Sequence, residues 1–427
     1  MTRSRSTAHL GLIALIAAGA AWLAVAGHAQ NRPATERWVT TWATALVPRA
    51  SQPQAIPAAQ GAPQGPPRFA NQTLRQIVHT SIGGQRLRVV LTNLFGTLPL
   101  DVGAARVALR QGGSAIVAGS ARPLSFSGRA AVSIPVGAVM ISDPVSLTLP
   151  PLSDLVIDVH LPGDTGASAS PITSHTGALQ TGYVSAPGDH TGTAELPVAS
   201  TITSWFFLAR VEVVALPQVG AVALLGDSIT DGSRSTADTN NRWPDHLARA
   251  LARGNVPMGV VNLGVAGNRL LSDGNSPGAL ARFDREVLVP PGVTHLVVME
   301  GINDIGRGVS AEDVIAAHRQ IIGRARARGL VVIGATLTPI EDTSFEGYYT
   351  PGHEAARQTV NQWIRTGGAY DAFVDFDAVV RDAARPTRLQ SQYASPDFIH
   401  PNDAGYRAMA DAVDIGLFRP PAADVSR

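Results

Sequence analysis

The second half of the chain alternates short, wholly apolar runs with longer amphipathic stretches, and this alternation limits the possible folds more than any other feature. Five apolar runs follow Leu216, at residues 221–226, 256–264, 294–301, 330–339 and 372–376. They are separated by stretches of helical periodicity, such as RWPDHLARALAR and SAEDVIAAHRQIIGRARARG. Strands that are apolar throughout are buried on both faces, which requires a parallel sheet covered by helices on both sides. The sequence therefore predicts an α/β domain over residues 217–427, with a doubly wound sheet of about five strands in the flavodoxin-like order.

The preceding segment has a different periodicity. Between Asn71 and Leu216, apolar and polar residues alternate with a period of two, as in residues 86–91 and 154–161. Glycine and proline recur at short intervals, which is typical of an all-β sandwich and not of crossover helices. Residues 30–216 are therefore predicted to form a β-sandwich domain. Within it, the Pro-, Gln- and Ala-rich stretch at 48–67 has almost no large apolar residue, so we expect a loop that contributes little to a core.

The N-terminus has the features of an export signal. Arg3 and Arg5 precede an apolar run from Leu10 to Gly27, and small residues follow at the positions that a signal peptidase reads. A membrane anchor is the alternative, but the run is marginal in length, rich in Ala and Gly, and not followed by a basic stop. We expect a cleaved signal peptide over residues 1–29, no stable membrane insertion afterwards, and a secreted or periplasmic protein.

Composition excludes several kinds of site. The chain has no cysteine, which rules out thiol nucleophiles, cysteine-ligated zinc and disulfides. The net charge is +1 and no long block of Lys or Arg is present, so no nucleic-acid partner is expected. Phosphate loops, dinucleotide fingerprints, H-E-x-x-H and the G-x-S-x-G elbow are all missing from the sequence, so no metal and no cofactor are predicted.

Polar residues and one glycine follow the apolar runs at informative positions. Ser228 follows the first run in LLGDSITDG, Gly264 closes the second in NLGVAGNRLL, and Asn303 follows the third in EGINDIG. Asp397 and His400 lie in SPDFIHPNDAGY, before the last predicted helix. Each residue alone is weak evidence, because these residue types are common in turns and helix caps. Loops after parallel strands meet at one edge of the sheet, so we expect the five residues to converge.

In this order the four blocks resemble those of the GDSL, or SGNH, hydrolase family: Ser in GDSIT, Gly in the second block, G-x-N-D in the third and D-x-x-H near the C-terminus. The resemblance covers about residues 221–417. The stretches NNRWPDHLA, GNRLLSDG and ALARFDREVL are similar to a bacterial branch of secreted arylesterases and acylhydrolases associated with polysaccharide breakdown. TSIGGQRLRVVLTNLFG resembles the N-terminal β domain of that branch. The resemblance implies the SGNH hydrolase fold and a serine esterase.

The resemblance also implies a role for each of the five residues. Ser228 is the expected nucleophile and needs an adjacent base, which is His400, while Asp397 orients the imidazole and stabilises its charged form. The expected oxyanion donors are the Ser228 and Gly264 N–H groups and the Asn303 side-chain amide.

Further residues near these blocks are interpreted from their types. The carboxylates beside them, Asp227, Asp231 and Asp304, are predicted to be structural. Tyr348 and Tyr349 lie in the loop at 341–351, after the fourth apolar run, and are candidates for stacking on an aryl or sugar group. Packing within a surface loop is the alternative for both tyrosines.

The predicted function is hydrolysis of short-acyl esters, acetyl above all, with a small ester or an acylated glycan as substrate. The choice of acyl group and glycan follows from the resemblance alone. One alternative is an O-acyltransferase that passes the acyl group from the same serine to a sugar hydroxyl, and another is a non-catalytic carbohydrate-binding protein. The β domain is open to three roles: glycan binding, one wall of the active site, or stabilisation of the catalytic domain.

Overall fold

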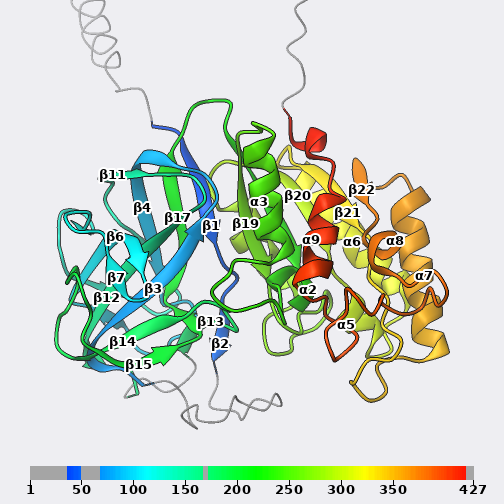
Figure 1. Ribbon diagram of the computed structural model, residues 1–427, viewed down its shortest axis with the longest axis horizontal. Coiled ribbons are helices and arrows are strands. Elements are labelled where there is room, and N and C mark those ends of the chain that lie inside the picture. The colour runs from blue at the N-terminus through cyan, green and yellow to red at the C-terminus, as the bar shows by residue number, and fades with distance from the viewer. Residues whose placement is uncertain (1–35, 50–67, 167–171, 420–427) are drawn as a thin grey trace, which may run out of the picture. The chain divides into compact units, whose positions relative to one another are not determined.

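Figure 1 shows the computed structural model, which describes residues 36–49, 68–166 and 172–419. The described residues between 38 and 214 consist of strands and loops and are called the β part, and residues 220–418 are called the α/β part. From Trp38 onward the chain groups into one compact unit, and the domain boundary at 216/217 stays a prediction. The predicted signal peptide at 1–29, and residues 50–67 of the predicted loop, lie outside the described residues.

The β part is built from short antiparallel strands. Their bounds are β1 (Trp38–Ala43), β2 (Val47–Arg49), β3 (Ala70–Thr80), β4 (Gly84–Thr92), β5 (Leu100–Val102), β6 (Ala104–Gly112), β7 (Ala115–Ile116), β8 (Arg122–Pro123), β9 (Val132–Ile134), β10 (Val139–Ile141), β11 (Val145–Leu149), β12 (Ser153–Asp164), β13 (Ile172–Thr176), β14 (Gly182–Pro187), β15 (Val198–Ile202), β16 (Ser204–Phe206) and β17 (Leu208–Val214). Pro48 and Arg49 were predicted to begin a loop, but they close β2, which pairs with β13.

Two larger sheets enclose the core of the β part. One has the order β1-β17-β4-β10, with β11 also paired to β4, and the other has the order β15-β14-β3-β12-β6-β7, with β8 paired to β6. Alternate residues of β4 (Leu87, Val89, Leu91) and of β12 (Leu155, Ile157, Val159) are buried in one apolar cluster. These are the positions that the period of two indicated, so antiparallel sheets sharing one core account for the alternation in the sequence.

Helices separate the strands of the α/β part. The strands are β18 (Gly220–Gly226), β19 (Met258–Gly264), β20 (Val293–Met299), β21 (Val331–Ala335) and β22 (Ala372–Val374). The helices are α2 (Ser228–Asp231), α3 (Trp243–Arg253), α4 (Ala279–Phe283), α5 (Ile302–Ile305), α6 (Ala311–Arg326), α7 (Pro351–Thr366), α8 (Phe376–Val380) and α9 (Asp403–Asp411), with a π-helical turn η1 (Asp284–Leu288) and a 3-10 turn η2 (Ile415–Phe418). No helix in the described ranges is long and apolar enough to span a membrane.

The five strands form one parallel sheet in the order β19-β18-β20-β21-β22. Alternate residues of β18 face opposite sides: Ala223 packs in a cluster with residues of α6 and α7, and Leu224 packs in another with residues of α3 and α9. Figure 1 shows α3 and α9 beside each other over the sheet. Gly226 is in register with Gly264 on one side and with Met299 on the other, so three loops leave this edge together.

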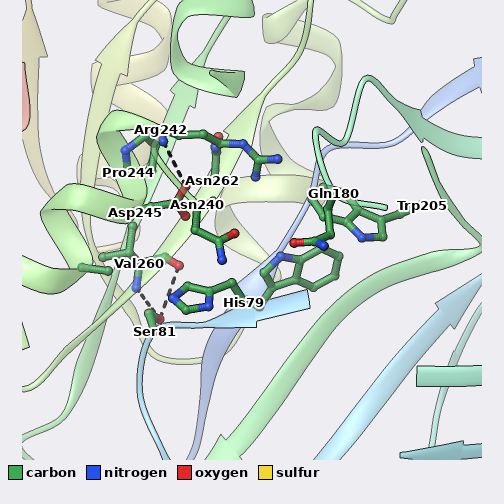
Figure 2. A pocket seen from close by; sticks show the side chains of 12 residues that line it. His79, Ser81, Gln180, Trp205, Asn240, Arg242, Pro244, Asp245, Val260 and Asn262 are labelled. Atoms are coloured by element: carbon green, nitrogen blue, oxygen red, sulfur yellow. Dashed lines mark hydrogen bonds between the residues drawn. The ribbon is translucent and has the colours of Figure 1, made fainter. Parts of the chain in front are cut away.

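The β part and the α/β part are joined by direct contacts. Val39 of β1 is buried in the same apolar cluster as Ala223, and the Thr40 N–H donates to the Pro291 carbonyl at 3.0 Å. Figure 2 shows a second contact, in which the Val260 N–H of β19 donates to the Ser81 Oγ at 2.9 Å. The cavity beside this contact has a volume of about 30 Å³, which is room for a water molecule or two.

An ion pair buried in the β part gives a test of this fold. Arg75 of β3 and Asp158 of β12 are opposite each other in the sheet, and their side chains form two hydrogen bonds of 2.8 Å while 0% and 2% exposed. We expect Arg75→Ala to lower the free energy of unfolding by about 3–5 kcal/mol, because it leaves a buried carboxylate unpaired. Urea unfolding measures the change.

Arg68→Ala is the matched control. It removes an Arg–Asp pair between the same two chain segments, but the Arg68 side chain is 69% exposed, so the free energy of unfolding should change little. Equal losses in the two variants would contradict the prediction.

Candidate active site

Ser228 lies at the carboxyl edge of the parallel sheet, at the start of a single helical turn. β18 ends at Gly226, and the Asp227 side chain caps α2 by accepting the Ile229 N–H at 2.9 Å. Ser228 is the first residue of α2, so its own N–H has no acceptor within the helix. The turn ends at Gly232, which has a left-handed φ of 95°. A strand, a cap and one turn therefore present both the hydroxyl and the N–H of Ser228 at this edge.

The structure brings Ser228, His400 and Asp397 together. The Nε2 atom of His400 is 2.8 Å from the Ser228 Oγ, and its Nδ1 atom is 2.9 Å from Asp397 Oδ2. The D-x-x-H spacing works because Asp397 folds back on its own turn, where its Oδ1 accepts the N–H groups of Ile399 at 3.2 Å and His400 at 3.0 Å. A short local turn thus fixes the carboxylate against the ring.

Two further side chains reach Asp397. Ser395 Oγ donates to Oδ1 at 2.8 Å, and Arg234 Nε donates to Oδ2 at 2.8 Å. Burial by itself raises the pKa of Asp397, but the hydrogen bonds and charge of His400, together with Ser395, hold this pKa well below its usual value. An ionised carboxylate accepts only, so the His400 Nδ1 carries a hydrogen. In the neutral ring the Nε2 is then the acceptor that faces the Ser228 hydroxyl.

The amide of Gly264 has a different partner from the predicted one. Its N–H donates to the Asn262 Oδ1 at 2.9 Å, and a Cβ built on Gly264 would overlap the backbone of Thr230 and Asp231. Gly264 is therefore required for the close contact between β19 and α2, and we correct its predicted role as an oxyanion donor. Gly267 lies three residues later, has a left-handed φ of 73°, and its N–H has no hydrogen-bond partner within the described residues.

Asn303 is held by contacts on both ends of its amide. Its Nδ2 donates to the Asn268 carbonyl at 2.9 Å, and its Oδ1 accepts the Tyr348 hydroxyl at 2.5 Å. Because a carbonyl oxygen only accepts, the first bond fixes which end of the amide is nitrogen. One N–H of Asn303 remains for another acceptor. Asn268 is the neighbour of Gly267, so this contact also ties the third block to the second.

The two tyrosines do not form the predicted stacking surface. Tyr348 is only 8% exposed and its hydroxyl is used by Asn303, while burial raises its pKa above the usual value and so keeps the hydroxyl a donor. Tyr349 is half-buried and packs against the apolar core. The exposed ring in this loop is Phe345, which lies edge-on to the His400 ring at 6.4 Å. Phe345 is three residues before Tyr348, but nothing in the sequence indicated that its ring contacts His400.

A group of buried charges lies behind Ser228. Asp227 and Glu300 are fully buried, and each has one carboxylate oxygen without a partner among the described residues. Arg282 is also fully buried and donates to the Gly226 carbonyl at 3.1 Å and to Glu300 at 3.4 Å. Asp304, predicted to be structural, accepts the Leu270 N–H at 2.8 Å. Glu300 and Arg282 lie in the stretches EGINDIG and ALARFDREVL, but sequence reasoning gave neither a role, because their pairing joins segments 18 residues apart.

Burial raises the pKa of Asp227 to about 6 and raises that of Glu300 well above its usual value. The Ile229 N–H and the charge of His400 act on Asp227 in the opposite direction, but burial is the larger effect. Among the described side chains, no group of three His, Asp or Glu residues is arranged to hold a metal ion. The groups gathered at this edge are therefore a hydroxyl, an imidazole, a carboxylate and N–H donors.

Comparisons with known proteins place the α/β part in a family. Residues 224–408 match the model of the GDSL-like Lipase/Acylhydrolase family. No curated protein matches the chain. Three similar solved structures are a GDSL-like lipase from Bacteroides thetaiotaomicron VPI-5482, a member of the lipolytic protein G-D-S-L family from Veillonella parvula DSM 2008, and a variant of an acetyl xylan esterase from Geobacillus stearothermophilus.

The lipase is 17% identical with a TM-score of 0.38, and the match covers 48% of this chain and 90% of the lipase. The Veillonella protein is 22% identical with a TM-score of 0.36, covering 45% of this chain and 96% of that one. The esterase is 22% identical with a TM-score of 0.35, covering 46% of this chain and 94% of that one. Residues 224–408 of this chain form a GDSL-like lipase/acylhydrolase domain, which is an ester hydrolase domain.

Proposed function

We propose that the protein is a secreted serine esterase in which Ser228, His400 and Asp397 form the catalytic triad. The observation that carries the proposal is the line of two contacts, 2.8 Å from Ser228 Oγ to His400 Nε2 and 2.9 Å from His400 Nδ1 to Asp397 Oδ2. A serine hydroxyl attacks an ester only when an adjacent base removes its proton, and the contact with Nε2 meets this requirement. Secretion is supported by the signal-like sequence of residues 1–29.

The reaction proceeds in two displacements. The Ser228 Oγ attacks the ester carbonyl as His400 takes its proton, and the imidazolium then gives that proton to the departing alcohol, which leaves an acyl-serine. A water molecule then attacks the acyl-serine while His400 takes a proton from this water. His400 gives the proton to the Ser228 Oγ as the acid leaves. Asp397 stabilises the imidazolium in both steps without receiving a proton.

The developing oxyanion needs donors that are already in place. We assign this role to the Ser228 N–H, the Gly267 N–H and the remaining N–H of the Asn303 amide. The first lies at the start of α2 without a helical acceptor, and the second belongs to a left-handed glycine and has no partner among the described residues. The third is oriented by Asn268 and Tyr348. Tyr348 acts on the oxyanion only through Asn303, so it is a positioning residue.

The proposed substrates are esters of acetyl or other short acyl groups, on an aryl alcohol or a glycan. The sequence similarity to secreted arylesterases and acylhydrolases supports this class. The exposed ring of Phe345 beside His400 supplies an apolar contact for an aryl or sugar ring in place of the two tyrosines. An O-acyltransferase with the same triad would instead form a new ester, and a carbohydrate-binding protein would bind without turnover.

The function is tested with Ser228→Ala. The wild-type protein and the variant are given p-nitrophenyl acetate, p-nitrophenyl octanoate and acetylated xylan, with and without a sugar acceptor, and both free acid and new ester are measured. We expect acid from the acetyl substrates and a loss of kcat of about 10⁶ in the variant, since the nucleophile is removed. New ester in place of acid would favour the transferase. Equal rates for the two proteins, or binding of xylan without turnover in both, would contradict the proposal.

A second test concerns Asn303. Tyr348→Phe removes the hydroxyl that holds the Asn303 Oδ1 and leaves the ring packed, so we expect kcat on p-nitrophenyl acetate to fall about tenfold, the equivalent of one hydrogen bond, with little change in KM. Tyr349→Phe is the control, because this half-buried ring packs against the core, and its kcat should stay at the wild-type value. A normal kcat in Tyr348→Phe would remove Tyr348 from the positioning of Asn303.

A third test uses pH. The folded-state pKa of Asp227, about 6, lies above its usual 3.8, so the folded protein holds this proton more tightly than the unfolded chain does. The stability this proton contributes is present at low pH and is lost as pH rises through about 6. The variant Asp227→Asn has no carboxyl at this position, so it lacks this dependence of stability on pH. From pH 4.5 to pH 7.5 we expect the wild type to lose about 2 kcal/mol of unfolding free energy relative to the variant, measured with urea.

Asp143→Asn is the control for the pH test. The Ser125 hydroxyl and the Gly128 N–H lower the pKa of Asp143, so its contribution to stability is lost only on the acid side of the window. The difference between the wild type and this variant should therefore stay nearly constant from pH 5 to pH 7.5. Parallel curves for the wild type and Asp227→Asn over the same interval would show that the pKa of Asp227 is not raised in the folded protein.

A further inference from the structure

One buried side-chain pair links the β part directly to the nucleophile helix. His175 lies in β13, and its Nε2 is 3.0 Å from the Asp231 Oδ1 at the end of α2. Its Nδ1 is 2.7 Å from the Ala45 carbonyl. The two side chains are 2% and 6% exposed, so water does not compete for either group. The ring thus bridges two β-part segments and the helical turn that begins with Ser228.

The partners of the ring determine where its hydrogens lie. The Ala45 carbonyl only accepts, so the Nδ1 carries a hydrogen. The Nε2 faces a carboxyl oxygen, so one further hydrogen lies between His175 and Asp231, bonded to one of them and shared with the other. Removing either partner alone would leave the other buried without its hydrogen bond.

The helical turn depends on contacts of this kind. α2 has four residues, and a single helical turn has almost no stability of its own. It is held at Thr230, whose carbonyl accepts from the Asn262 Nδ2 at 3.0 Å, and at Asp231 by His175. The first of these contacts comes from the parallel sheet, and the second comes from the β part.

Segments of the β part next to His175 and Ala45 make further contacts with the α/β part. After β13, the Thr181 N–H and its Oγ1 both donate to the Asp238 carboxylate at 2.6 Å, and the Asp238 N–H donates to the Leu179 carbonyl at 2.9 Å. Ala45 and Val47 also form a small buried cluster with Val265, two residues before Gly267. The β part therefore contacts both the loop after Ser228 and the loop that contains Gly267.

We propose that His175 and Asp231 are positioning residues that set the direction of the Ser228 hydroxyl, so that the β part is a component of the catalytic unit. The proposal rests on the proposed function, because it requires Ser228 to be the nucleophile. It predicts that changes in β13 alter turnover even on a substrate too small to reach the β part.

The test uses Asp231→Ala, Asp231→Asn, His175→Ala and the double variant His175→Ala/Asp231→Ala, assayed with p-nitrophenyl acetate well below the melting temperature of each. A second readout is the rate at which a fluorophosphonate modifies Ser228. We expect kcat to fall by up to about a hundredfold in both alanine variants, with little change in KM, because displacement of a reacting group slows the chemical step.

Two of these variants separate positioning from general destabilisation. Asp231→Asn should stay within a few-fold of the wild type, because its amide donates to the neutral Nε2 and keeps the contact. The double variant leaves neither the carboxyl nor the imidazole buried without its partner, and the Ala45 carbonyl loses its donor in the double variant just as it does in His175→Ala. The loss of kcat in the double variant should therefore be no greater than that in His175→Ala.

Ser81→Ala is the matched control. It breaks another hydrogen bond between the β part and the α/β part, from the Val260 N–H to the Ser81 Oγ (Figure 2). Val260 lies four residues before Gly264, the residue of β19 that contacts α2. It should lower the melting temperature and leave kcat unchanged. Wild-type kcat in Asp231→Ala and in the double variant, with Ser228→Ala inactive, would overturn the positioning role and leave the esterase standing. A wild-type protein no more active than Ser228→Ala would overturn both.

Discussion

The close contact between α2 and the end of β19 is the constraint on which the site depends. Gly264 has no side chain, and the backbone of Thr230 and Asp231 occupies the space that a Cβ would need. The Asn262 side chain fixes the same contact by accepting the Gly264 N–H and donating to the Thr230 carbonyl. Because α2 begins with Ser228, the contact of α2 with β19 sets the position of the Ser228 hydroxyl above the sheet. The proposed roles of His400 and Asn303 require that this position is maintained.

The pKa values of two carboxyl groups near Ser228 are shifted in opposite directions. Asp397 is surrounded by donors and a ring that gains positive charge, which hold its pKa low, while Asp227 is enclosed with Glu300 and its pKa is raised. In the proposed mechanism, the Asp397 anion stabilises the imidazolium. Asp227 can instead take up a proton, which limits the negative charge near the place where the proposed oxyanion forms.

The sequence was most informative where structure follows from local pattern. The apolar runs predicted the parallel strands, the period of two predicted the buried positions of β4 and β12, and the order of the four blocks predicted which residues meet at the sheet edge. Gly264 and Gly267 could not be distinguished, because the difference is a backbone angle and a hydrogen bond to Asn262. The contacts of Tyr348, Glu300 and His175 were also not predicted. Each depends on a contact between distant segments, and His175 and Asp231 are 56 residues apart in the chain.

The short link between the β part and the α/β part has a consequence for truncation of the protein. β17 ends at Val214 and β18 begins at Gly220, so a single cut in the sequence would separate the two parts. The same cut would remove Val39 from the apolar cluster that it shares with Ala223, and it would leave the Asp231 carboxyl without the His175 ring. The α/β part alone would therefore expose apolar surface and carry an unpartnered carboxyl in the helical turn that begins with Ser228.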